Sequence, residues 1–431
     1  MNKKINYTEF IIGLIVLFGV ILLGKAKLAS DMLVFRLLIG ISLGYVFARA
    51  YTGFAGSVNR AYTTGSTKLM RAMMIMFFVA ALGVAGLLVF NLNPETQTVL
   101  VEYGLNVKPI NLGLILGAMM FGFGMSMSSC CASGMMSDLA NEAPKAIITM
   151  FFFGMGVVLG MPFDKASWVN NSWFTAGENN GVFFPDLFNG SSLYNMLGGV
   201  ILTGILALIV IVLAYAYESY RKRKGTLGVV PSELKAENER HIEVPAEKDQ
   251  LFTYVFNKVF VNSWSVYTGA LLIAVIFIII VAATKGGWGA SGPFGNWFAK
   301  VIMVFGVKAE TLANYAGQEP EFFSASIFSN GTGIQNMGIF IGALTYLLTS
   351  GQMKETSQNF FNYPKIQWFL FMLGGLTMGV GTRLAKGCNA GGLFTPIAHM
   401  SLSGWFFLLA LIVGGILGNT FQKLIFDKVS Q

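Results

Sequence analysis

The amino-acid sequence predicts an all-α polytopic membrane protein, because of its composition and the spacing of its apolar runs. Of the 431 residues, 54% are hydrophobic and 12% are charged, and the mean hydropathy is +0.63. Soluble domains contain about 25% charged residues. Apolar runs recur along the whole chain, at 8–24, 33–50, 69–90, 111–129, 145–160, 196–217, 266–283, 336–349, 367–384 and 403–421. Most can cross a hydrocarbon core about 30 Å thick, so we expect about ten transmembrane crossings.

The first run follows MNKK and resembles a signal peptide in its basic start and apolar core. It lacks a clear small-residue cleavage site and precedes a polytopic chain, so we interpret it as an uncleaved first helix. Three later runs have a different character. The run at 336–349 is short, and those at 111–129 and 367–384 end in sequence rich in Gly, Ser and Cys. These features favour broken or re-entrant helices.

Basic residues cluster at helix ends, in MNKK at 1–4 and RKRK at 221–224. Such clusters are typical of cytoplasmic loops. The net charge of +8 does not indicate nucleic-acid binding, because no basic surface with interleaved aromatic residues accompanies it. We therefore expect a multi-pass membrane protein. Its N-terminus, its C-terminus and the loop at 218–265 should be cytoplasmic, and residues 161–195 should lie outside.

The charged segment in the middle of the chain divides it into two halves. Residues 218–250 hold 14 charged residues, whereas the whole chain has 29 Lys and Arg and 21 Asp and Glu. We expect a first membrane half at 1–217 with repeat 1 at about 33–160. A charged, solvated linker at 218–265 should follow, and then a second membrane half at 266–431 with repeat 2.

An internal repeat places one cysteine in each half. LGAMMFGFGMSMSSCCASG (116–134) aligns without gaps with LGGLTMGVGTRLAKGCNAG (373–391), which pairs Cys131 with Cys388. The chain has only three cysteines, so this match carries more weight than those of the glycines. A weaker similarity pairs Gly65 with Gly331, each ahead of a membrane helix. Together they predict a two-fold repeat.

Counting crossings sends the helix at 111–129 inward and the helix at 367–384 outward. The two repeats should therefore have inverted topology, which places a site near the bilayer midplane between the halves. In each repeat two glycines lie seven residues apart, nearly two turns of helix, and form a smooth stripe for close helix packing. These pairs are Gly117 with Gly124 and Gly374 with Gly381. Both repeat cysteines should then lie inside the protein.

A new helix start follows each cysteine, with Ser133 and Asn389 as the expected N-caps. A helix N-terminus at membrane depth attracts anions through its free N–H groups and its dipole. This favours an anionic ligand over a cation.

Two segments resemble the signature segments of the YeeE/YedE family of bacterial sulfur-compound transporters. They are GVGTRLAKGCNAGGLFTPIAHMSLSGWFF and FGFGMSMSSCCASG. ARAYTGFAGSVNRAYTTGSTKLMRAM at 48–73 is similar to the family's third, cysteine-containing segment. The longer YedE-type members, associated with selenium metabolism, look closest. The resemblance implies uptake of thiosulfate, or a related small sulfur or selenium species, through an hourglass-shaped protein whose cysteine thiols at the constriction contact the substrate.

Carried over to this sequence, Cys131 and Cys388 match two of the family cysteines. The third would fall at Gly53, where this chain has no thiol. The family's Gly-Gly-Cys becomes Ser129-Cys130-Cys131, so Cys130 either compensates or faces a neighbouring helix.

The candidate substrate-binding residues gather around the two repeat motifs and the short helix at 336–349. They are Cys131, Cys388, Cys130, Gly124, Gly134, Gly381, Gly387, Asn389, Lys386, Arg383, Gln335 and Asn336. A sulfur thiol suits a soft, polarisable anion, although a free cysteine is usually a small buried hydrophobe. The charged candidates could draw in an anion or anchor the helix at the membrane interface. The amides could line the path or bond between helices.

Enzyme chemistry finds little support in the sequence. No phosphate-binding loop with Gly-Lys-Ser/Thr is present, and two histidines without a CxxC spacing make a metal or haem site improbable, so we expect no cofactor. The leading hypothesis is an inner-membrane permease for thiosulfate or a related anion. Its partners are that anion, the lipid bilayer and a cytoplasmic sulfur-carrier protein. Alternatives are a selenium-compound transporter and a membrane sulfurtransferase or thiol-redox protein that carries sulfur as a cysteine persulfide.

Overall fold

The computed structural model describes residues 6–92, 103–242, 248–358, 361 and 363–429. These residues form helices and no strands, apart from one isolated bridge between Phe183 and Ser401. Among them, nine helical segments are long and apolar enough to cross a membrane. This confirms the predicted all-α polytopic class. The basic cluster at 1–4 lies outside the described residues.

The long helices account for nine of the ten predicted runs. They are α1 (Tyr7–Lys27), α2 (Asp31–Ala50), α4 (Lys68–Phe90), α5 (Leu112–Ser128), α7 (Ala143–Gly160), α9 (Ser192–Arg223), α12 (Val266–Thr284), α18 (Lys365–Leu384) and α20 (Leu402–Val429). The tenth run lies in α16 (Gly331–Thr349), which is not among the nine candidate spans. Its first turns contain Gln335 and Asn336, both buried.

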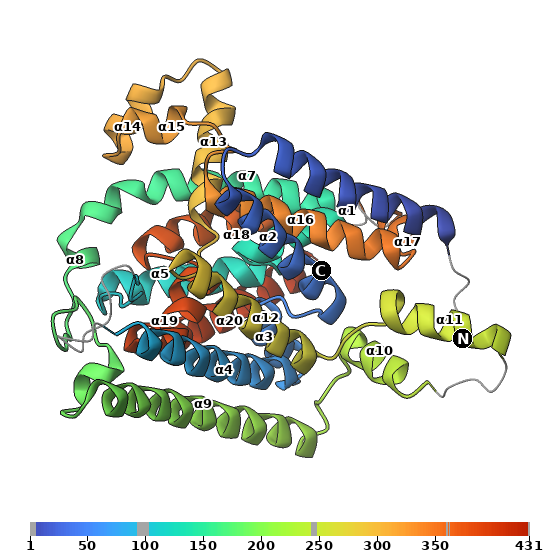
Figure 1. Ribbon diagram of the computed structural model, residues 1–431, viewed down its shortest axis with the longest axis horizontal. Coiled ribbons are helices and arrows are strands. Elements are labelled where there is room, and N and C mark those ends of the chain that lie inside the picture. Colours follow the sequence, from blue (N-terminus) through green and yellow to red (C-terminus); the bar gives the residue numbers. More distant parts are fainter. Residues whose placement is uncertain (1–5, 93–102, 243–247, 359–360, 362, 430–431) are drawn as a thin grey trace.

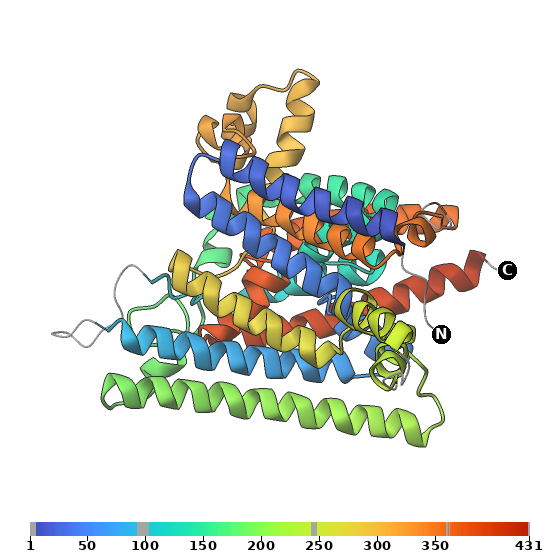
Figure 2. The same ribbon diagram turned by 45° about the vertical axis from the view of Figure 1, so that its right-hand side comes forward.

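Shorter helices connect these spans. They are α3 (Gly56–Thr63), α6 (Ala132–Asn141), η1 (Met161–Lys165), α8 (Ser167–Asn170), η2 (Phe184–Leu187), α10 (Pro231–Arg240), α11 (Lys248–Phe256), η3 (Asn257–Val261), α13 (Gly292–Val304), α14 (Ala309–Ala316), α15 (Pro320–Ser324), α17 (Met353–Ser357), η4 (Asn389–Phe394) and α19 (Thr395–Ala398). The segment 161–191 with α8 lies at one end of the helix bundle, and α10 and α11 lie at the other (Figure 1). The start of α1 and the end of α20 point to the same end as α10 and α11 (Figure 2).

Local sequence explains where many of the long helices begin. Six of them start after an Asn or Ser whose side-chain oxygen accepts a hydrogen bond from the backbone N–H three residues later: Asn6, Ser30, Asn111, Ser191, Ser265 and Asn330. This N-cap bond satisfies one of the donors that a helix leaves unpaired at its start.

The two predicted helix breaks occur, and they have the same backbone geometry. α5 ends at Ser129, with φ 55°, and α18 ends just before Lys386, with φ 52°. Two residues after each left-handed residue stands a cysteine in extended conformation, and it is the N-cap of the next helix. The prediction of Ser133 and Asn389 as N-caps is therefore wrong. The left-handed turn ends the first helix early enough for the second helix to begin directly after the cysteine.

The glycine stripes of α5 and α18 pack against each other in antiparallel fashion. A Cβ added at Gly117 would lie 2.6 Å from the carbonyl oxygen of Gly381, and one at Gly124 would lie 2.4 Å from that of Gly374. The reverse contacts are similarly close. A Cβ added at Gly381 would lie 2.6 Å from the Gly117 carbonyl oxygen, and one at Gly374 would lie 2.7 Å from the Gly124 carbonyl oxygen. Only glycine permits this approach, which is how small residues pack membrane helices.

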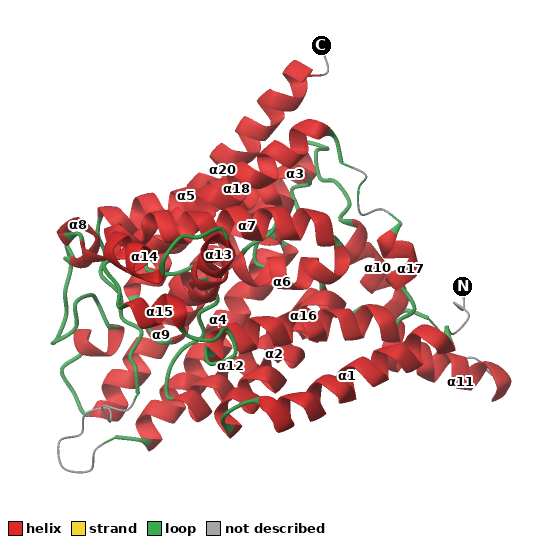
Figure 3. Cartoon of the chain, turned by 90° about the horizontal axis from the view of Figure 1, so that it is seen from above, coloured by secondary structure: helices red, strands yellow, loops and turns green. Residues whose placement is uncertain are grey.

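Two more helices extend this crossing symmetrically. α7 packs on α18, where a Cβ at Gly379 would lie 2.2 Å from the Phe153 carbonyl oxygen. α20 packs on α5, where a Cβ at Gly122 would lie 2.3 Å from the Leu411 carbonyl oxygen. Seen from above, these four helices are neighbours (Figure 3). Gly122 and Gly379 occupy aligned positions of the two repeats, so the packing is what an inverted repeat requires.

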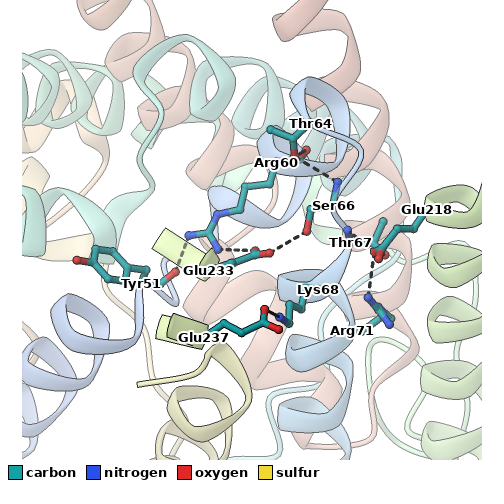
Figure 4. Close-up of polar contacts among 10 residues, drawn as sticks. All are labelled: Tyr51, Arg60, Thr64, Ser66, Thr67, Lys68, Arg71, Glu218, Glu233 and Glu237. Atoms are coloured by element: carbon teal, nitrogen blue, oxygen red, sulfur yellow. Dashed lines mark hydrogen bonds and ion pairs between the residues drawn. The ribbon is translucent and has the colours of Figure 1, made fainter. Parts of the chain in front are cut away.

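The charged segment after α9 packs onto the first half of the protein. Arg60 pairs with Glu233 of α10 at 3.0 Å, and Lys68 pairs with Glu237 at 3.5 Å. Glu218, near the end of α9, accepts hydrogen bonds from Thr67 and Arg71 (Figure 4). The segment is therefore held against the end of α3 and the start of α4 by ion pairs.

Candidate functional site

A cavity of about 480 Å³ opens beside the break between α5 and α6, and we call it the linker-side cavity because α10 pairs with its residue Arg60. It contains three of the predicted site residues, Cys130, Cys131 and Gly134. Its lining also includes Phe47, Ala48, Tyr51, Gly53, Ala55, Gly56, Asn59, Arg60, Ser129, Ser133, Ser137, Asp138, Asn141, Glu142 and Lys145.

The Cys131 thiol is held at the start of α6. Its side chain is buried, and its sulfur lies 3.5 Å from the hydroxyl oxygen of Ser133. A Cβ added at Gly134 would come within 3.4 Å of the same sulfur, so glycine leaves room beside it. Cys130 is also buried and lines the same cavity. Both cysteines are free thiols. The cavity therefore has two neighbouring sulfur atoms on one wall.

The position of the missing third family cysteine faces this cavity as well. Gly53 is one of its lining residues, and a Cβ added there would meet nothing within 4 Å. A cysteine side chain would therefore fit at this position without moving its neighbours.

The charges of the linker-side cavity are balanced. Lys145 is buried and lies 3.1 Å from a carboxylate oxygen of Asp138, and it also pairs with Glu142. Arg60 pairs with Glu233 and also donates to the backbone carbonyl of Tyr51. Each cation here has a carboxylate partner, so the cavity carries no excess of positive charge.

Two adjoining cavities lie on the other side of the protein, and we call them the loop-side cavities because Asp164, in the segment after α7, lines one of them. Their volumes are about 250 Å³ and 340 Å³. They share the residues Ser291, Gly292, Lys386 and Gly387. The first is also lined by Asn106, Lys108, Gly287, Trp288, Gly289, Ala290, Pro293, Asn330, Thr332 and Gly391, and the second by Asp164, Thr382 and Arg383. Cys388 is buried and directly follows Gly387.

The charged candidates point to these cavities and not to lipid. Arg383 lies 3.6 Å from a carboxylate oxygen of Asp164, and Lys386 donates a hydrogen bond to the side-chain oxygen of Asn170. Both residues come from the turn that presents Cys388. Their side chains therefore place positive charge beside the second helix break.

The amide candidates lie deeper. Gln335 and Asn336 are buried, and neither lines the three cavities. Gln335 accepts a hydrogen bond from Arg36 at 3.2 Å, and Asn336 donates one to the Ala290 carbonyl at 2.9 Å. Asn389 donates to the sulfur of Met125 at 3.3 Å. These hydrogen bonds join α16 to α2 and to the loop before α13, and η4 to α5.

Gly124 and Gly381, also predicted as site residues, lie in the crossing of α5 and α18. Neither of them lines the three cavities. The close helix packing that they permit positions the two breaks.

A partition of aromatic rings separates the linker-side cavity from the loop-side cavities. Phe47 lines the former and Trp288 lines the latter, and their rings stack with centroids 6.0 Å apart. Phe54 and Phe394 pack against Trp288 at 6.2 Å and 6.3 Å. All four rings are buried. Among the described residues, the linker-side cavity shares no lining residue with the loop-side cavities, and the Phe47 and Trp288 rings lie in contact between them.

Sequence reasoning missed Lys108, Trp288 and Lys145. Lys108 is the clearest omission, because it is a single basic residue in the apolar stretch 105–116. Its ammonium donates to the backbone carbonyl oxygens of Lys386 and Gly391, on either side of Cys388. An isolated charge next to a membrane run is a signal that could have found it.

Comparison with known proteins now identifies the family. A family model described as "Sulphur transport" matches residues 49–417. This range includes both helix breaks and the cysteine and lysine residues that line the three cavities. The chain belongs to this family. The resemblance to the YeeE/YedE family predicted from the sequence is thereby confirmed, and the protein is a multi-pass membrane protein.

Individual relatives in the family differ in how much of the chain they match. The probable transporter YedE of Escherichia coli is 29% identical over 170 residues, 38% of this chain and 41% of that protein. The chain thus matches about two fifths of the YedE proteins. The thiosulfate transporter TsuA of Escherichia coli is 22% identical over 385 residues, 89% of this chain and 93% of that protein. TsuA of Spirochaeta thermophila is 23% identical over 320 residues, 72% of this chain and 78% of that protein.

Proposed function

We propose that this member of the Sulphur transport family is an inner-membrane permease that carries thiosulfate, or a closely related small sulfur-containing anion, into the cytoplasm. Cys131 and Cys388 contact the anion during passage. The observation that carries the proposal is the equivalent placement of the two thiols. Each is the N-cap after a left-handed turn; Cys131 lines the linker-side cavity, and Cys388 directly follows Gly387, which lines the loop-side cavities. The TsuA relatives support the substrate, because their matches cover most of both chains.

The chemistry of a thiol fits this cargo. An S–H group is a weak hydrogen-bond donor and sulfur is polarisable, so a thiol contacts a soft terminal sulfur without binding it too tightly to release it. The substrate enters a loop-side cavity, passes Cys388, then Cys131, and leaves through the linker-side cavity. The partition formed by Phe47 and Trp288 must open for this passage. Gating by rearrangement at an interface between two repeats is the usual way in which such folds alternate access.

The direction of transport rests on the orientation of the chain. The basic cluster at 221–224 forms the end of α9, on the side of α10 and α11, and cytoplasmic loops are rich in Lys and Arg. We place the linker-side cavity in the cytoplasm and the loop-side cavities outside. The chain termini then lie in the cytoplasm, and a soluble sulfur-carrier protein would collect the product at the linker side.

The substrate is tested by uptake of radiolabelled thiosulfate into cells that lack other sulfur-uptake routes. Cells that express the chain should accumulate label, and unlabelled thiosulfate should compete with it better than sulfate, sulfite, selenite or cysteine. Stronger competition by selenite would assign the protein to selenium-compound transport. Absence of uptake from cells with confirmed membrane expression would overturn the proposal.

A second candidate function is sulfur transfer, which the adjacent thiols of Cys130 and Cys131 in one cavity favour. A cysteine thiolate would attack the terminal sulfur of thiosulfate, form a persulfide and release sulfite with the electron pair of the broken S–S bond. Mass spectrometry of purified protein after exposure to thiosulfate distinguishes the two. A permease leaves the protein mass unchanged, whereas a sulfurtransferase gains the mass of one sulfur atom on a cysteine.

A further inference from the structure

The loop-side cavities have an excess of positive charge that the linker-side cavity does not have. Lys108 and Lys386 line the smaller loop-side cavity, and no Asp or Glu is among its lining residues. The adjoining cavity adds Arg383 and a single carboxylate, Asp164, which pair with each other. Lys108, Lys386 and Arg383 against the single carboxylate of Asp164, which also attracts Lys386, leave these cavities with a net excess of two positive charges.

Lys108 is held by backbone groups instead of by a carboxylate. Its ammonium donates to the carbonyl oxygens of Lys386 and Gly391. An ammonium has three donors, and these contacts use two of them. Within the described ranges, no carboxylate lies at ion-pair distance from Lys108 or Lys386. Lys386 instead donates to the neutral side chain of Asn170.

The lysine of the opposite cavity shows the contrast. Lys145 pairs with both Asp138 and Glu142. Removing an ammonium from bulk water is costly unless an opposite charge compensates it. The linker-side cavity supplies that compensation from its own side chains, whereas the loop-side cavity leaves it to be supplied by a ligand.

We propose that the smaller loop-side cavity is the entry site for the anion, where Lys108 and Lys386 hold the oxygen atoms of a small divalent oxyanion beside the Cys388 turn. This inference rests on the proposed function and names the substrate class of that site. Two ammonium groups suit an oxyanion end, because charge-assisted hydrogen bonds to oxygen are the strong ones. The soft terminal sulfur or selenium atom is then left to contact the thiol. Because Lys108 also bridges two carbonyls around Cys388, it positions the turn that carries the thiol.

The pH dependence of uptake follows from the same geometry. Burial lowers the pKa of the Lys108 ammonium, the Cys388 sulfur opposes this, and the charges of Lys386 and Arg383 add to the lowering, so that the pKa is about 8. The protonated, anion-binding form therefore prevails below that pH and is lost above it. An arginine stays charged throughout this range. Wild-type KM for the anion should rise as the external pH increases through about 8, and Lys108→Arg should abolish the rise.

The experiment measures initial rates of thiosulfate uptake against concentration and pH for wild type, Lys108→Gln, Lys108→Arg and Lys308→Gln. Lys308 is an exposed lysine that lines none of the three cavities, so its variant removes the same charge elsewhere. Lys108→Gln should raise KM roughly tenfold or more, with a smaller change in kcat, as expected for loss of a charge-assisted contact. Lys308→Gln should leave KM unchanged.

The outcomes separate this inference from the proposed function. Wild-type uptake tests the function, and the ratio of variant to wild-type KM tests the entry site. If wild type carries sulfite or sulfate in place of thiosulfate, the same ratio is measured with that anion. If Lys108→Gln has the same KM and the same pH profile as the wild-type protein, the proposed entry site is wrong. If that variant does not reach the membrane, Lys108→Arg decides: a flat pH profile supports the site, and the wild-type rise contradicts it.

Discussion

At the scale of single residues, Cys131 and Cys388 share one backbone geometry although their neighbours differ. The left-handed residue two positions earlier is Ser129 in one repeat and Lys386 in the other. Neither serine nor lysine predicts a left-handed turn, because glycine and asparagine usually occupy that position. The sequence therefore predicted that the helices break, from the composition around the cysteines, but misplaced the N-caps.

The same limit explains which site residues were predicted. The cysteines stand out because three occur in the whole chain and two of them align in the repeat. Lys108 does not stand out, because its partners are backbone carbonyls of Lys386 and Gly391, far away in sequence.

Gly53 gives a prediction at this scale. Because a Cβ there meets nothing within 4 Å, Gly53→Cys should fold with wild-type thermal stability in detergent. The matched control is Gly44→Ala, whose Cβ would lie 1.9 Å from the Ile339 carbonyl oxygen and should lower the unfolding temperature. Equal unfolding temperatures for Gly53→Cys and Gly44→Ala would contradict the open space at Gly53.

At the scale of elements, the crossing of α5 and α18 sets the positions of both helix breaks. The sequence predicted the stripes from the seven-residue spacing of glycines, and the structure shows that they pack on each other. The docking of α10 was not foreseen, since a run of charges normally forms a solvated segment. Its partner Arg60 lies 173 positions from Glu233, which no local pattern reveals.

Substitution in the crossing should destabilise the protein strongly. Gly124→Ala would place a Cβ 2.4 Å from a backbone oxygen, and Gly381→Ala would place one 2.6 Å from another. Overpacking of this kind costs about 1–3 kcal/mol. Gly86→Ala in α4 is the control, because its Cβ has open space around it. Thermal unfolding of the purified variants measures the difference, and equal unfolding temperatures for Gly86→Ala and Gly124→Ala would contradict the crossing.

The two ion pairs of α10 should contribute unequally. Glu233 accepts from Arg60 at 3.0 Å and from Ser66 at 2.9 Å, and the side chains of the Arg60–Glu233 pair are 17% and 10% exposed. The Lys68–Glu237 pair is 36% and 59% exposed, so it contributes about 0.5 kcal/mol or less. Glu233→Gln should therefore speed hydrogen exchange of the α10 amides, whereas Glu237→Gln should not. Equal exchange in both variants would mean that apolar contacts hold α10.

At the scale of the whole molecule, two sets of cavities approach the aromatic partition from opposite sides. The side of the membrane that each faces is testable with a membrane-impermeant maleimide in intact cells. Glu178 is exposed and lies between α8 and η2, so Glu178→Cys should be labelled, whereas Lys224→Cys, after α9, should react only after the membrane is opened. The three native cysteines are buried and should contribute little background. The opposite labelling pattern would reverse the proposed direction of transport.

The central claim is that thiosulfate passes through the protein in contact with Cys131 and Cys388. Its most direct test is the initial rate of labelled thiosulfate entry into liposomes that contain purified wild type, Cys131→Ala, Cys388→Ala or Cys130→Ala. Loss of either repeat thiol should reduce entry about tenfold or more, as expected when a hydrogen bond to a charged group is lost. Cys130→Ala should retain most of the rate. Wild-type rates in both Cys131→Ala and Cys388→Ala would contradict the account.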